Sequence, residues 1–103
     1  MGIGMQIIYL GLTGTTSLEA EAALQLLRLE PYSACFSDCR LAIERVGKDS
    51  TRTVYEVRLE ISAQTNGLRH VLRCVRDSAE AAIQCAFNKA LRVLRVVTRA
   101  GRG

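Results

Sequence analysis

Three segments of the chain alternate between apolar and polar residues: 39–46, 53–62 and 68–76. Alternation predicts strands with one buried face, because successive side chains on a strand point to opposite sides. The positions that share the predicted inner face are Cys39, Leu41, Ile43, Tyr55, Val57, Leu59, Ile61, Leu68, His70, Leu72 and Cys74. A short apolar run closed by glycine, MQIIYLG at residues 5–11, predicts a fourth strand.

Two other segments, residues 17–30 and 79–97, carry apolar residues at helical spacing. Residues three or four positions apart lie on one side of a helix, so each segment has a stripe to bury. The predicted stripes consist of Leu18, Ala22, Leu26, Leu29, Ala82, Ile83, Ala86, Phe87, Ala90, Leu94 and Val97. The candidate capping residues, whose side chains can accept from first-turn amides, are Thr16, Ser17, Asp77 and Ser78.

The predicted order is strand, helix, three antiparallel strands and helix, with a tight turn at Asn66-Gly67 before the last strand. Because one sheet face is apolar, we expect both helices to pack side by side on it. This is an α+β fold, a β-α-β-β-β-α two-layer sandwich with a four-stranded sheet. We expect a single domain over residues 5–98, with residues 1–4 disordered or an expression remnant and residues 99–103 a flexible basic tail.

Positive charge is concentrated in the second half of the chain. The net charge is +4, but up to Val46 there are 3 basic and 5 acidic residues, whereas from Gly47 onward there are 11 basic and 5 acidic ones. A basic region of this kind attracts polyanions, either a nucleic acid or an anionic membrane surface.

The last predicted helix carries a run of bases without acids. Their spacing of three, three, four and three residues places them near one helical face, and no acidic residue follows Glu80. Cations near a helix C-terminus are favourable in any case, so a solvated charged face and a membrane-surface helix stay open beside a polyanion-binding face. These bases are Lys89, Arg92, Arg95, Arg99 and Arg102.

The predicted last strand adds Arg69, Arg73 and Arg76. Arg69 and Arg73 are expected on the face opposite Leu68 and Leu72, leading into the loop before the last helix. One continuous basic rim from strand to helix is therefore geometrically possible. Outward bases on the other strands alternate with outward acids, which favours cross-strand pairing there.

The sequence gives little support for a catalytic site or a metal site. The chain has 1 histidine and no recognisable set of nucleophile, base and acid, so we expect no enzyme and no cofactor. Cys35, Cys39, His70 and Cys74 match a zinc set in number, but strand positions four apart are about 13 Å from each other. No secretory signal precedes the cysteines, so we expect free thiols that act as small core residues in a cytoplasmic protein. No apolar stretch reaches the length of a membrane span.

Three segments resemble one known family. They are MQIIYLG at residues 5–11, LEPY at 29–32 followed by Phe36, and DSAEAAIQCAFNKALRVLR at 77–95. They resemble the short ribosome hibernation promoting factors, also called ribosome-associated inhibitor or sigma-54 modulation proteins. The matching positions in the last segment are Ala81, Ala82, Ile83, Lys89, Arg92 and Leu94.

The resemblance implies the same element order and a protein that binds the small ribosomal subunit. It would overlap the mRNA and tRNA region and inhibit translation under stress, through a basic face on rRNA phosphates. Lys89 and Arg92 enter this site by motif match and Arg28 by its place on the first helix. Charge geometry alone adds Arg95, Arg99, Arg69, Arg73 and Arg76. We expect a monomer or weak dimer, with no membrane and no small-molecule substrate.

Two alternatives stay open. A double-stranded RNA-binding domain has a similar order without the first strand, but its second helix opens on a lysine cluster where this chain reads DSAEAA. A protein-interaction module would use the last helix as an amphipathic partner. Salt separates that module from an RNA-binding protein, since affinity for RNA falls steeply with ionic strength.

Overall fold

The computed structural model describes residues 4–47, 53–63 and 69–102, with side chains up to residue 62 in the middle range and 96 in the last. The elements are β1 (Gln6–Leu10), α1 (Thr16–Leu29), the 3-10 helix η1 (Glu30–Cys35), β2 (Phe36–Arg45), β3 (Tyr55–Ala63), β4 (Arg69–Arg76) and α2 (Ala79–Arg102). The predicted α+β class and element order are confirmed. The predicted Asn66-Gly67 turn and inner residue Leu68 lie outside the described residues.

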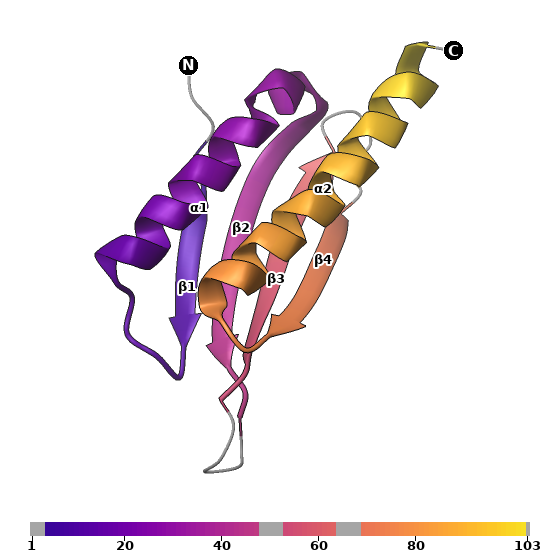
Figure 1. Cartoon of the computed structure of the whole chain (residues 1–103). Coiled ribbons are helices and arrows are strands. Elements are labelled where there is room, and N and C mark those ends of the chain that lie inside the picture. Colours follow the sequence, from indigo (N-terminus) through magenta and orange to yellow (C-terminus); the bar gives the residue numbers. More distant parts are fainter. Residues whose placement is uncertain (1–3, 48–52, 64–68, 103) are drawn as a thin grey trace.

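The four strands form one sheet in the order β1-β2-β3-β4. β1 is parallel to β2, whereas β2, β3 and β4 are successively antiparallel. A parallel pair cannot be closed by a tight turn, and α1 with η1 supplies the crossover that it needs. Figure 1 shows α1 and α2 side by side on one face of the sheet, running in the same direction. Within the described residues, no helix covers the other face of the sheet (Figure 1).

The core lies between the sheet and the helices and follows the sequence pattern. Alternate positions of the central strands β2 and β3 are buried, and so is the stripe of α2 from Ala82 to Leu94; the side chain of Val97 lies outside the described residues. On α1, Leu27 is 65% exposed although it neighbours the predicted stripe. The largest fully buried side chains are Phe87, Leu29, Leu41, Ile43, Leu59, Ile83, Val57 and Cys39.

The helix ends differ from the predictions by one to five residues. Thr15 caps α1, because its hydroxyl accepts from the amide of Leu18 at 3.1 Å, so the predicted cap at Thr16 or Ser17 is wrong by at least one residue. Ser78 caps α2, accepting from Ala81 at 3.2 Å. The helix predicted to end at Val97 continues to Arg102, since no proline or glycine interrupts it before residue 101.

Two cysteines are joined, which contradicts the prediction of four free thiols. Cys74 on β4 and Cys85 on α2 form a disulfide, with a Cα–Cα distance of 6.1 Å. Strand alternation turns Cys74 inward, and the first turns of α2 place Cys85 opposite it; this juxtaposition is tertiary and has no local sequence signal. Cys39 is a buried thiol, and burial first and the charge of Asp38 second raise its pKa to about 12.

The structure brings no zinc set together. In the part of the chain that the structure describes, no three His, Cys, Asp or Glu side chains are placed to share a metal ion. Within the same residues, no helix combines the length and the apolar content needed to cross a bilayer.

Candidate nucleic-acid interface

Four cations lie on the helices, on the side away from the sheet or at its rim. Arg28 lies in the last turn of α1, and Lys89, Arg92 and Arg95 lie along the middle of α2. The last turn of α1 lies beside the middle of α2, because Arg28 donates to Asn88, the residue before Lys89. We call this set the basic helix face.

Arg28 bridges the two helices through neutral partners. Its Nη1 donates to Oε1 of Gln25 at 2.7 Å and to Oδ1 of Asn88 on α2 at 2.9 Å. Amide oxygens orient the guanidinium but do not neutralise it, because neither side chain carries a charge. Arg28 is therefore held in place with its full positive charge available to a ligand.

Lys89 lies at the side of α2 that faces the edge strand. Its Nζ donates to the backbone carbonyl of Arg73 on β4 at 2.8 Å. That carbonyl is available because β4 pairs only with β3 in the described sheet. The carbonyl is again a neutral acceptor, so this contact places no counter-charge beside the ammonium at the junction of helix and sheet.

Arg92 and Arg95 are exposed and make no ion pair with any described residue. Glu80, in the first turn of α2, lies about 18 Å from Arg92 along the helix axis at about 1.5 Å per residue. Both guanidinium groups can therefore meet phosphates without first breaking an internal pair. Arg99 also lies on α2, but its side chain is outside the described residues.

The sheet arginines are placed differently. Arg69 and Arg73 project from the uncovered face, where Arg73 Nε lies 2.8 Å from Glu56 and Arg69 Nη1 lies 3.5 Å from Glu60. Residues 69 and 73 point away from the helices because strand positions alternate, and the outward glutamates of β3 lie beside them. The continuous rim predicted from charge is therefore split between two faces.

The central part of the uncovered face is electrically compensated as well. Arg58 Nη1 lies 2.9 Å from Glu44 and 3.3 Å from Glu56, which joins β2 and β3 through one guanidinium. We call this face, carrying Glu44, Glu56, Arg58, Glu60, Arg69 and Arg73, the outer sheet face. The pairing of Arg58 with Glu44 is the cross-strand pairing predicted for the outward bases of these strands. The pairing of Arg69 and Arg73 with glutamates of β3 was not predicted.

Arg76 ends β4 on the helix side of the sheet. Its Nη1 donates to the carbonyl of Val75 at 2.7 Å, and its Nη2 lies 3.1 Å from Sγ of Cys85. Of the three strand arginines predicted for the site, Arg76 alone lies beside α2 without a carboxylate partner among the described residues. It extends the basic helix face toward the start of α2.

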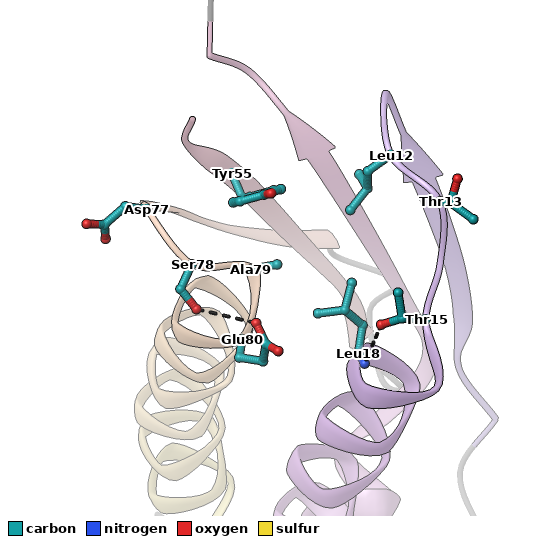
Figure 2. Close-up of a pocket in the computed structure, with 9 residues that line it drawn as sticks. All are labelled: Leu12, Thr13, Thr15, Leu18, Tyr55, Asp77, Ser78, Ala79 and Glu80. Carbon is teal, nitrogen blue, oxygen red and sulfur yellow. Dashed lines mark hydrogen bonds between the residues drawn. The ribbon is translucent and has the colours of Figure 1, made fainter. Parts of the chain in front are cut away.

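A pocket of about 400 Å³ offers a second candidate site at the opposite end of the helices. Figure 2 shows it between the first turns of α1 and α2, with Leu12, Leu18 and Tyr55 as apolar lining. Asp77 and Glu80 contribute the charged groups of the lining. An acidic rim repels phosphate, so this pocket is not a nucleic-acid site.

The helix ends at this pocket are also capped internally. The hydroxyls of Thr15 and Ser78 accept from first-turn amides of α1 and α2, as Figure 2 shows for Thr15 and Leu18. Glu80 accepts from Ser17 of α1 and from Ser78, each at 3.4 Å. A helix N-terminus binds an anion through free amides, and here the protein's own oxygens occupy part of that capacity.

Two parts of the interface have no signal in the sequence. Gln25 and Asn88 are ordinary polar helix positions, and their role as neutral anchors of Arg28 depends on the distance between two helices. The disulfide next to Arg76 depends in the same way on the packing of α2 on β4.

Comparisons with known proteins give the fold. No family model matches the sequence, and no curated protein matches it closely enough to count as a relative. The structure is similar to that of a ribosomal subunit interface protein from Coxiella burnetii, with a TM-score of 0.76, 14% sequence identity and coverage of 92% of this chain and 97% of that one. It is also similar to the crystal structure of the Thermus thermophilus Protein Y N-terminal domain, with a TM-score of 0.74, 16% identity and coverage of 94% and 99%. This chain therefore has the fold of these two proteins.

Proposed function

We propose that this protein binds the small ribosomal subunit and inhibits translation as a hibernation factor. The observation that carries the proposal is the basic helix face, whose four cations have neutral partners or none among the described residues. It is supported by the fold, which is that of a protein described as a ribosomal subunit interface protein. The resemblance of residues 77–95 to the hibernation factors points to the same partner.

The proposed mechanism is occlusion. Arg28, Lys89, Arg92 and Arg95 contact rRNA phosphates, which fix the position of the protein without reading base sequence. Bound between the head and body of the small subunit, the domain covers the mRNA and tRNA region and prevents initiation. Binding energy comes from counterion release and charge-assisted hydrogen bonds, and no covalent bond is made or broken.

The distribution of charge along the two helices is consistent with the basic helix face turned toward the RNA. Glu19 and Glu80 lie in the first turns of α1 and α2, whereas the basic helix face comprises Arg28 in the last turn of α1 and three bases in the middle of α2. Glu19, Glu80 and Arg28 lie at helix ends where their charges complement the helix dipoles, and the separation of charge turns the cationic part toward a polyanion. The acidic end then faces away from the RNA.

A protein-interaction function is favoured by one observation. Leu24 and Leu27 are 60% and 65% exposed on α1, next to Arg28. Together they form a small apolar area that could contact a protein rather than an RNA backbone. Its binding would depend little on salt, because few counterions are released.

The test is sedimentation of the purified protein with purified small subunits through sucrose gradients at several salt concentrations. We expect co-sedimentation at low salt and a steep loss as salt rises, with a logarithmic slope of roughly three to four for four phosphate contacts. Large subunits serve as the control for general RNA affinity. Binding that does not change with salt, or that is equal for both subunits, would contradict the proposal.

A further inference from the structure

The disulfide lies within the connection between α2 and the edge strand. Cys74 follows Arg73, whose carbonyl accepts from Lys89, and Cys85 lies one helical turn before Lys89. Arg76 closes the same group, since its guanidinium lies 3.1 Å from Sγ of Cys85. One covalent bond therefore sits beside two cations of the candidate interface and joins the two elements that carry them.

Cys74 and Cys85 differ in access and in electrostatic surroundings. Cys74 is buried, with 3% of its surface exposed, whereas Cys85 is only partly buried. After reduction, the guanidinium of Arg76 favours the thiolate of Cys85, because a positive charge stabilises the anion. Cys85 is therefore the reactive sulfur, and Cys74 is the protected partner that resolves a mixed disulfide.

The redox state of the compartment that contains ribosomes indicates what this disulfide does. This step rests on the proposed function. Ribosomes work where thiols are kept reduced by glutathione and thioredoxin, and disulfides found there are mostly transient or redox-sensing. A bond between a buried and a partly buried cysteine at an RNA-binding surface fits such a sensor better than a permanent staple.

We propose that Cys74 and Cys85 form a reversible redox site whose oxidised form fixes α2 on β4 and so prepares the basic helix face for RNA. Oxidation begins when the Cys85 thiolate attacks a disulfide such as oxidised glutathione and releases one reduced glutathione. The Cys74 thiolate then displaces the second glutathione from Cys85, so two protein thiols become one disulfide and two glutathione thiols form. Reduction is the reverse exchange with two reduced glutathiones.

Fixing the helix has a defined effect on binding. The oxidised protein holds Lys89 and Arg76 at set positions before it meets RNA, so less conformational entropy is lost on association. In the reduced protein we expect α2 to keep its apolar contacts with the sheet, since the fully buried Ile83, Ala86 and Phe87 pack there without taking part in the bond. Reduction therefore weakens binding without unfolding the domain.

The first experiment measures the redox site without a ribosome. The full chain is equilibrated in buffers with defined ratios of reduced to oxidised glutathione, alkylated, and analysed by peptide mass spectrometry. We expect Cys74 and Cys85 to titrate together within the physiological range, with Cys39 as the internal thiol control. A pair that stays oxidised in excess reduced glutathione, or stays reduced in excess oxidised glutathione, would overturn the proposal.

The role of Arg76 is tested in the reduced protein. In the variant Arg76→Gln, the alkylation rate of Cys85 at neutral pH should fall about threefold or more, because less thiolate is present. The pH at which the rate reaches its midpoint should rise. Arg40 lies on β2 opposite Glu60 and is exposed on the uncovered face, so Arg40→Gln removes the same charge away from Cys85 and serves as the matched control. An unchanged rate in Arg76→Gln would overturn the assignment of Cys85 as the activated sulfur.

The second experiment links the site to binding. We expect oxidised protein to bind small subunits about three- to tenfold more tightly than reduced protein, and Cys85→Ser to bind like reduced protein in both buffers. Equal affinity of the two forms would overturn the switch while leaving the proposed function intact. If neither form binds small subunits, the proposed function fails, and the glutathione titration still decides the redox site on its own.

Discussion

The two exposed faces of this protein use the same residue type with opposite electrical results. On the outer sheet face, Arg58, Arg69 and Arg73 each lie within 3.5 Å of a glutamate on their own or a neighbouring strand. On the basic helix face, Arg28 is held by two amide oxygens, and Lys89 by a carbonyl. The number of arginines on a face therefore does not locate a polyanion site. The charge of the groups that accept their hydrogen bonds does.

The largest expected effect comes from reversing two charges on the helix face. The double variant Lys89→Glu/Arg92→Glu should lower affinity for small subunits by about a hundredfold and reduce the salt slope by roughly two. Both side chains are exposed, so the circular dichroism spectrum and thermal midpoint should change little. Undiminished co-sedimentation of a folded double variant would show that the interface lies elsewhere.

A smaller loss is expected when the anchor of Arg28 becomes charged. Asn88→Asp keeps an oxygen acceptor at 2.9 Å but supplies a carboxylate that neutralises the guanidinium. Affinity should fall several-fold and the salt slope by about one, measured in the same gradients. Asn88→Ala is the control, because it removes the hydrogen bond without adding charge and should leave the slope unchanged. Equal slopes for both variants would show that Arg28 meets no phosphate.

The comparison can also be tested from the sheet side by removing acids. In Glu56→Gln/Glu60→Gln, the carboxylates that pair with Arg73 and Arg69 become neutral, so the outer sheet face gains positive charge. Binding to an unrelated RNA duplex should strengthen two- to threefold at low salt, measured by fluorescence anisotropy. If the affinity for the duplex does not rise, pairing with glutamate is not what prevents Arg69 and Arg73 from binding RNA.

The smallest effect is expected for the sheet arginines themselves. Arg69→Gln/Arg73→Gln should change small-subunit affinity less than twofold, because the removed charges are already matched by acids. Stability should fall by less than about 1 kcal/mol in urea unfolding, since both side chains are more than half exposed. A loss of affinity as large as that of the helix-face variant would show that both sets of bases belong to one binding surface, as charge alone predicted.

The fold was predictable because each element has its own local period. The inner positions of β2 and β3, such as Leu41 and Leu59, are fully buried as alternation predicts, and Phe87 on α2 is buried as the helical period predicts. The parallel pairing of β1 with β2 could not be predicted from periodicity, because it depends on the crossover that α1 makes. The predicted cap at Ser78 is confirmed, whereas the cap of α1 was wrong by one residue because neighbouring hydroxyls compete within one turn. The end of α2 was predicted five residues too early.

The candidate site was predictable only in part. Charge spacing on α2 placed Arg92 and Arg95 on an exposed face, which the structure confirms. The same reasoning joined Arg69 and Arg73 to that face, and the structure separates them. Alternation predicted that Arg69 and Arg73 lie on the face opposite Leu72. It did not predict that they pair with glutamates of β3, because that pairing depends on the register of the two strands.

Taken alone, the sequence determined the periods of hydrophobicity, the surplus of bases in the second half and the lack of acids beyond Glu80. Only the tertiary structure decided which bases have a carboxylate beside them, because ion pairing depends on distances between groups far apart in the chain. It also decided that Cys74 meets Cys85, a pairing of strand and helix. Periodicity acts over a few residues through backbone geometry, whereas electrostatic pairing and disulfide formation act across space, and only the packed fold sets those distances.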